Sequence, residues 1–122
     1  MEKCKTSTFG RDVYIGGFIK VNILGTEYEI IEGNVIDYPI LKKYSGYVDY
    51  STKEIIITTD TGDWEVDDIE TTKKEILRHE LIHAFLVESG LNRNCDWHNE
   101  EMVDWLAIQF NKIKDIFKTC NI

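Results

Sequence analysis

The stretch DDIETTKKEILRHELIHAFLVESG, residues 67–90, decides the fold. Acidic residues open it, where the helix macrodipole favours negative charge, and Gly90 closes it as a residue suited to a left-handed cap. The stretch therefore predicts one helix that runs to about Glu88. Its second half is apolar nearly all round, which is typical of a helix buried on most sides.

Three ionisable side chains lie within or beside this apolar part: His79, Glu80 and His83. A buried helix has little reason to carry such groups unless they have partners. Residues at i and i+4 share a helix face, so the two imidazoles can converge on one metal ion. The H-E-x-x-H spacing predicts His79 and His83 as metal ligands and Glu80 as the catalytic base that acts on water. The alternative is a polar stripe that binds no metal.

A second helix is predicted from about His98 to Phe117, with Asp96 or Asn99 as its cap. The connection after Gly90 is short, so the two helices should be neighbours. Apolar residues recur at helical spacing along the second helix and should pack inward: Val103, Leu106, Phe110, Ile113 and Phe117.

The third metal ligand should come from this second helix. Glu100 opens the helix, and Asp104 lies one turn further on the same face. We expect Glu100 to bind the ion and Asp104 to accept a hydrogen bond from the outer nitrogen of a ligand histidine. His98 is the alternative third ligand or a group that stabilises an oxyanion, although an exposed histidine at the helix start is the simpler interpretation. The charge preference of a helix start would account for Glu100 without a metal.

These residues resemble the gluzincin group of metallopeptidases. In that group a H-E-x-x-H helix is followed by a helix whose glutamate is the third zinc ligand, often with an aspartate four residues later. The segment NEEMVD, residues 99–104, matches that arrangement, and residues 100–107 look like the E-x-x-x-D-x-x-A pattern of several small zincins. The chain looks most similar to single-domain minigluzincins and to small metallopeptidase-like proteins of the ImmA type. The resemblance covers roughly residues 79–107 and is architectural elsewhere.

The resemblance implies a zinc-dependent hydrolase, a metalloendopeptidase that cleaves a peptide or protein substrate. It also implies an edge strand above the cleft that binds extended peptide, for which residues 54–59 are the candidate; an ordinary central strand is the alternative. No His or Tyr follows Asp104 to stabilise the oxyanion, so His98 or one of Tyr44, Tyr47 and Tyr50 would have to substitute. A catalytically weak or inactive zinc-bound interaction module, or a metal-free interaction protein, is the alternative function.

The first half of the chain predicts β structure. Residues 17–24 and 27–32 should form a hairpin around Gly25-Thr26, and residues 46–50 and 54–59 a second one. Residues 35–44 could contain a helical turn. The expected fold class is α+β: a small, mostly antiparallel sheet followed by two packed helices that carry the metal site. We expect one zincin-like domain over residues 1–122, β-rich over about 10–66 and helical over about 67–117.

The amino-acid composition excludes some classes of binding partner. The formal net charge is −8, which argues against nucleic acid and against an anionic membrane surface. The N-terminus lacks the apolar core of a signal peptide, and no apolar run reaches the length of a membrane span. Three cysteines without a close pair fit a reducing compartment. A cytoplasmic location is therefore expected.

Overall fold

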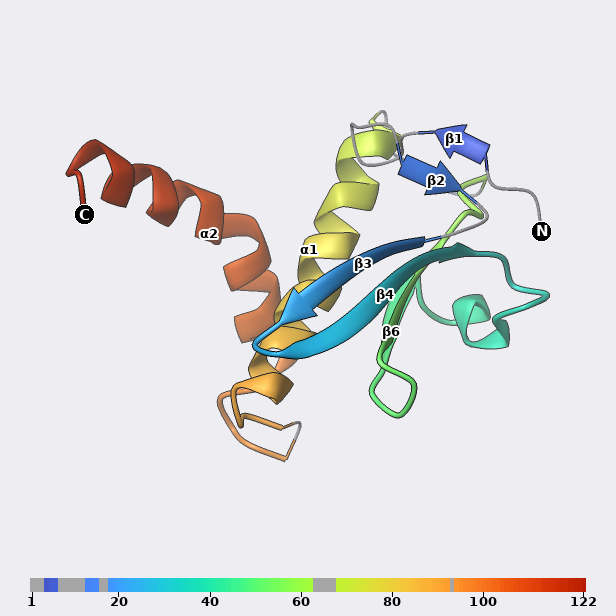
Figure 1. Cartoon of the computed structure of the whole chain (residues 1–122), viewed down its shortest axis with the longest axis horizontal. Helices are drawn as coiled ribbons and strands as arrows, with labels where there is room; N and C mark the ends of the chain where they lie inside the picture. Colours follow the sequence, from blue (N-terminus) through green and yellow to red (C-terminus); the bar gives the residue numbers. More distant parts are fainter. Residues whose placement is uncertain (1–3, 7–12, 16–17, 63–67, 93) are drawn as a thin grey trace.

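Four strands form a mixed sheet in the order β3-β4-β6-β5. The computed structural model describes residues 4–6, 13–15, 18–62, 68–92 and 94–122. The four strands are β3 (Phe18–Ile23), β4 (Thr26–Gly33), β5 (Gly46–Asp49) and β6 (Glu54–Thr58). Two helices follow, α1 (Ile69–Glu88) and α2 (Glu100–Thr119), which confirms the expected α+β class (Figure 1). Strands β1 (Cys4–Thr6) and β2 (Val13–Ile15) pair separately.

Both expected hairpins form. Strands β3 and β4 are antiparallel, and so are β5 and β6. The first turn lies at Leu24 and Gly25, one residue earlier than expected; both residues have positive φ, the geometry of a tight hairpin turn. A short 3-10 helix, η1 (Pro39–Lys42), supplies the helical turn within residues 35–44.

The sheet is not purely antiparallel, because β4 and β6 are parallel neighbours, with Ile30 opposite Ile55. After β4 the chain passes through η1 and forms the outer strand β5 before it returns as β6. The prediction that residues 54–59 form an edge strand is therefore wrong: β6 is a central strand, and β5 is the edge strand on that side of the sheet. The isoleucines of β6 are at most 1% exposed, as expected for a strand covered on both faces: Ile55, Ile56 and Ile57.

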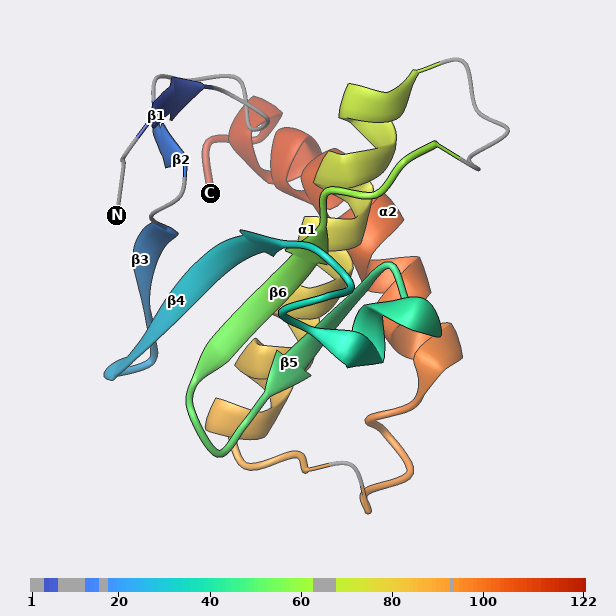
Figure 2. The same cartoon turned by 90° about the vertical axis from the view of Figure 1, so that its right-hand side faces the viewer.

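The two faces of the sheet have different covers. Helix α1 covers one face, while η1 lies over the other (Figure 2). The core between the sheet and α1 contains Ile23, Tyr28, Ile30, Ile55, Ile57 and Ala84. At Gly46 the edge strand approaches α1 so closely that an added Cβ would lie 2.9 Å from the side chains of Ile57 and Ile76. This glycine lets β5 lie directly beside α1.

Polar contacts fix α1 along its length. Asp68 caps its start by accepting a hydrogen bond from the Thr71 amide, and Gly90 follows its end with φ +102°. Near its start, Lys73 pairs with Glu32 of β4 at 3.4 Å. At its end, Glu88 accepts hydrogen bonds from the hydroxyls of Thr26 and Tyr28 at 2.8 and 2.7 Å. Helix α1 is thereby held to β4 at both ends.

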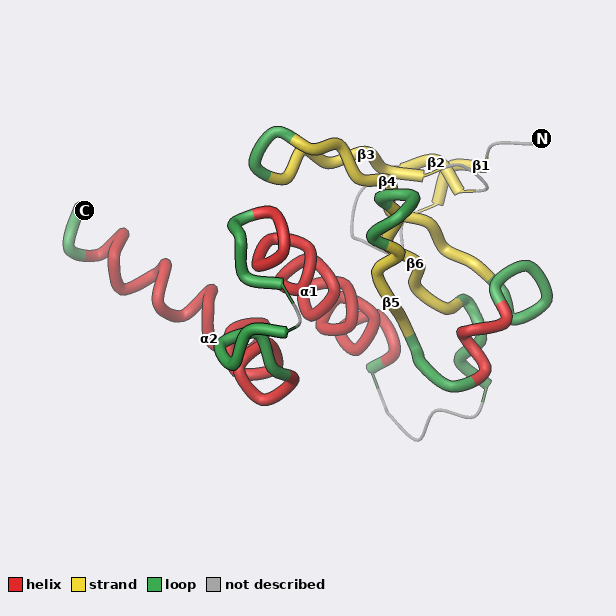
Figure 3. The backbone as a smooth tube through the Cα atoms, turned by 90° about the horizontal axis from the view of Figure 1, so that it is seen from below, coloured by secondary structure: helices red, strands yellow, loops and turns green. Residues whose placement is uncertain are grey.

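Helix α2 packs against α1 only through its first half. Val103 and Ala107 are buried there, whereas the second half projects away from the rest of the molecule (Figures 1 and 3). Leu106 and Ile113 are partly buried. The prediction that Phe110 and Phe117 pack inward is wrong, because about half of the surface of each is exposed. No helix within the described part of the chain has both the length and the apolar character needed to cross a membrane.

Candidate metal centre

The ring nitrogens of His79 and His83 meet on one face of α1. The two residues are one turn apart, and their Nε2 atoms are 3.1 Å from each other. Glu100 approaches both from the start of α2: its Oε1 lies 2.7 Å from Nε2 of His83, and its Oε2 lies 3.4 Å from Nε2 of His79. One ligand atom from each of the three residues falls within 4.8 Å of the others, so the group could hold a metal ion.

The local sequence explains how Glu100 reaches this position. Asn99 is the cap of α2, and its Oδ1 accepts a hydrogen bond from the Met102 amide at 2.9 Å. Glu100 is therefore the first helical residue, at the end of the connection from α1. Directly before the first histidine, Arg78 donates from Nε to the backbone oxygen of Ala107 at 3.2 Å and ties the two helices together. The carboxylate of Glu100 is therefore positioned by a helix whose start is capped by Asn99 and which is hydrogen-bonded to α1.

Asp104 supports the site from outside. Its Oδ1 lies 2.7 Å from Nδ1 of His79, the nitrogen that faces away from His83 and Glu100. An ionised carboxylate can only accept a hydrogen bond, so Nδ1 of His79 carries the hydrogen. The Nε2 atom of His79 then has a lone pair that points toward the potential metal ligands on His83 and Glu100. The contact is the one expected from the sequence, although the Asp104 side chain is 65% exposed.

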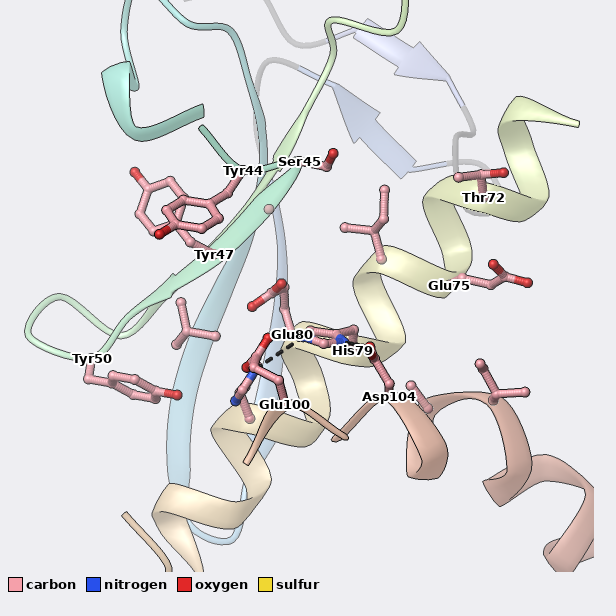
Figure 4. Close-up of a pocket in the computed structure, with 16 residues that line it drawn as sticks. Tyr44, Ser45, Tyr47, Tyr50, Thr72, Glu75, His79, Glu80, Glu100 and Asp104 are labelled. Atoms are coloured by element: carbon pink, nitrogen blue, oxygen red, sulfur yellow. Dashed lines mark hydrogen bonds and ion pairs between the residues drawn. The ribbon is translucent and has the colours of Figure 1, made fainter. Parts of the chain in front are cut away.

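Glu80 lies between α1 and the sheet rather than on the outer surface. It is 8% exposed and lines a cleft of about 530 Å³ that also contains the two histidines and Glu100. Figure 4 shows its carboxylate directed from α1 toward β5, beside the group formed by His79 and Glu100. A carboxylate in this position can exchange a proton with a water or substrate held in the cleft.

Strand β5 forms the opposite wall of the cleft. The lining residues from this side are Tyr44, Ser45, Gly46, Tyr47, Val48 and Tyr50. In the β5–β6 register Tyr47 lies opposite Ile56, so its side chain is on the sheet face away from α1. Burial raises the pKa of the Tyr47 hydroxyl. Of the three tyrosines considered as oxyanion groups, Tyr50 alone is directed toward the side of the cleft that holds Glu100, and Tyr44 and Tyr47 extend away from α1 (Figure 4).

His98 does not join the three donors. Its Nε2 lies 2.6 Å from Nδ1 of His83, and its Nδ1 lies 2.7 Å from the backbone oxygen of Leu91. Both ring nitrogens are therefore engaged behind His83, and this geometry does not place His98 as a ligand or an oxyanion group. The interpretation of His98 as an exposed residue is wrong, since it is 4% exposed.

The contact of His98 with His83 was missed from the sequence, because His98 lies in the connection between the helices, where no apolar periodicity indicates which residues are buried. Its short spacing from Glu100 was the one available signal. A comparison of the chain with protein-family models, curated proteins and solved structures finds no match. The likeness to gluzincins therefore stays a prediction from the motif residues.

Proposed function

We propose that this chain is a zinc-dependent metallopeptidase. The observation that carries the proposal is the convergence of Nε2 of His79, Nε2 of His83 and the carboxylate of Glu100, with Asp104 on the outer nitrogen of His79. Lone pairs and negative charge directed at one point repel each other unless a cation or a hydrogen-bonding proton lies between them. The arrangement of the donors thus favours a bound metal.

The donor chemistry suits zinc. Imidazole nitrogen and carboxylate oxygen are common zinc ligands, and catalytic sites use three protein ligands while keeping a fourth position open. When bound, zinc would supply a Lewis acid that polarises a carbonyl group and lowers the pKa of water. The supporting contact from Asp104 would orient His79 and raise its basicity as a ligand.

Glu80 would carry the proton transfers of hydrolysis. Its carboxylate faces the cleft next to the ligand histidines, and it is largely shielded from bulk water. It would take a proton from the attacking water and pass it to the nitrogen of the leaving amine. This is the role that the H-E-x-x-H spacing predicts for the residue directly after the first histidine.

The substrate would be an extended peptide that adds to the edge of the sheet. Strand β5 is the outer strand on the side of the cleft, and Gly46 brings it close to α1. Backbone hydrogen bonds along such an edge bind peptide with little dependence on side chains. A peptide on β5 would pass over His79, Glu80 and Glu100 on the cleft floor.

Replacing Glu80 tests the proposal. Glu80→Gln should reduce peptide cleavage by roughly 10²- to 10⁴-fold, the share of general acid–base catalysis, while one zinc ion per chain remains bound. The measurement is digestion of a peptide library by zinc-loaded protein, with bound zinc determined by elemental analysis. Glu75→Gln is the matched control, because Glu75 lines the same cleft on α1 outside the proposed chemistry.

Two outcomes would contradict the proposal. Cleavage by Glu80→Gln at the parental rate would remove Glu80 from the mechanism. No cleavage of any peptide by the zinc-loaded parent would instead favour a zinc-bound module that acts by binding a partner.

A further inference from the structure

We infer that His98 is a positioning residue that holds His83 in the tautomer able to bind a metal. The inference deepens the proposed metal site and rests on it, but not on peptide hydrolysis. It assigns His98 a role that is neither ligation nor oxyanion stabilisation.

A single backbone carbonyl sets the direction of the hydrogen bonds. The oxygen of Leu91 can only accept, so Nδ1 of His98, 2.7 Å away, must donate. In a neutral His98 ring the other nitrogen, Nε2, is then an acceptor. Nδ1 of His83, 2.6 Å from that acceptor, must therefore carry a hydrogen. Nε2 of neutral His83 then presents its lone pair to a metal ion held together with Glu100 and His79, whereas without a metal the Glu100 carboxylate, 2.7 Å from Nε2, competes for a hydrogen there.

The Leu91 carbonyl, which sets the direction of these hydrogen bonds, is itself held in place. Leu91 follows Gly90, whose φ of +102° ends α1, and the Leu91 amide donates to the backbone oxygen of Leu86 at 2.8 Å. The His98 amide donates to the backbone oxygen of Cys95 at 3.0 Å. Both ends of the connection between the helices are thus fixed where they meet the His98 ring. The connection joins the helices and also orients a ligand.

The contact of His98 with His83 is buried, whereas the contact of Asp104 with His79 is exposed to solvent. His83 and His98 are 3% and 4% exposed, whereas the Asp104 side chain behind His79 is 65% exposed. Water can replace a lost acceptor at Asp104, but it reaches the His83–His98 contact poorly. Loss of the His98 acceptor would therefore let the hydrogen of His83 move to Nε2, where it would block metal binding.

The tautomer can be measured without metal or substrate. In apo protein labelled with 15N-histidine, under alkaline conditions where imidazoles are neutral, long-range 1H–15N spectra distinguish protonated from unprotonated ring nitrogens. Glu100→Ala removes the carboxylate that competes for a hydrogen at Nε2, and in this variant we expect His83 to carry its hydrogen on Nδ1. A Glu100→Ala spectrum with the hydrogen on Nε2 of His83 would overturn the inference.

Two variants separate positioning from packing. His98→Phe keeps a ring but removes the acceptor. It should lower Zn²⁺ affinity by about 10- to 100-fold and, when combined with Glu100→Ala, populate the Nε2–H tautomer of His83. His98→Gln keeps an acceptor near the position of Nε2, and it should bind Zn²⁺ within a few-fold of the parent and, combined with Glu100→Ala, retain the Nδ1–H tautomer. Thermal melting of the apo proteins checks that both variants fold.

The outcomes distinguish this inference from the proposed function. Parental Zn²⁺ affinity in a folded His98→Phe, with the Nδ1–H tautomer kept when Glu100→Ala is added, would contradict the role of His98, even if the enzyme is active. If the parent binds Zn²⁺ but cleaves no peptide, and Glu100→Ala shows the expected tautomer, hydrolysis fails and the inference stands.

Discussion

The two halves of α2 follow one helical pattern but lie in different surroundings. In the first half Val103 is fully buried against α1, while in the second half Phe110 and Phe117 are 52% and 50% exposed. Figure 3 shows the second half leaving the body of the molecule. Helical spacing thus identifies the apolar face of a helix, but it does not say how far the neighbouring element extends.

The comparison also locates the proposed chemistry. Glu100 and Asp104 belong to the packed half, and the bond from Arg78 to the backbone oxygen of Ala107 braces that half. Ligands on a rigid, packed element are held more precisely than ligands on a free one. Substitutions of ligand or buried residues in the packed half should therefore affect metal binding or stability, and substitutions of apolar residues in the projecting half should have little effect on stability.

The largest effect is expected at Glu100. Glu100→Ala should lower zinc affinity more than about a hundredfold, because it removes a ligand and so exceeds the 10- to 100-fold effect of removing a supporting group. Competition with a chromophoric chelator measures the affinity. Glu101→Ala is the control, since this exposed neighbour lies outside the donor group and should change affinity only a few-fold. Equal losses in both variants would point to general acidity of the helix start instead of ligation.

Core packing should give the next largest contrast. Val103→Ala should cost about 2 kcal/mol of unfolding free energy, the value of removing buried methyl groups. Phe110→Ala should cost less than about 0.5 kcal/mol, because its side chain is half exposed on the projecting half. Urea denaturation at low protein concentration measures both. A Phe110→Ala cost equal to that of Val103→Ala would show that the second half is packed against another surface in solution.

A smaller, pH-dependent effect is expected where α1 is held to the sheet. Hydrogen bonds from Tyr28 and Thr26, helped by Lys53, hold the pKa of Glu88 below its ordinary value. The stabilisation is therefore present above the ordinary carboxyl pKa and is lost as pH falls through the lowered value. The melting temperature of Glu88→Gln should lie below that of the parent at neutral pH, and the gap should close on acidification. A gap that stays constant down to pH 3 would contradict this role.

Local signals made α1 and its site predictable. Asp68 and Gly90 mark its ends, and the i, i+4 spacing alone places His79 and His83 on one face. The position of Glu100 followed from the short connection and the cap at Asn99. These features depend on neighbours within a few residues, so the sequence carries them directly.

The pairing of strands that lie far apart in the sequence was harder to predict. The parallel contact of β4 with β6 depends on the path through η1 and β5, which no local pattern determines. The continuous apolar run Ile55-Ile56-Ile57 was nevertheless a signal for a strand buried on both faces. The burial of His98 depends on the carbonyl of Leu91 seven residues earlier, and the connection between the helices has no apolar periodicity that would indicate it.

The central claim is that two imidazoles and one carboxylate bind a single zinc ion between α1 and α2. Anomalous diffraction at the zinc edge, from crystals grown with one equivalent of Zn²⁺, tests it most directly. The account predicts one peak about 2.0–2.2 Å from Nε2 of His79, Nε2 of His83 and a carboxylate oxygen of Glu100. A map with no peak among these three residues, or with a zinc ion bound elsewhere, would contradict it.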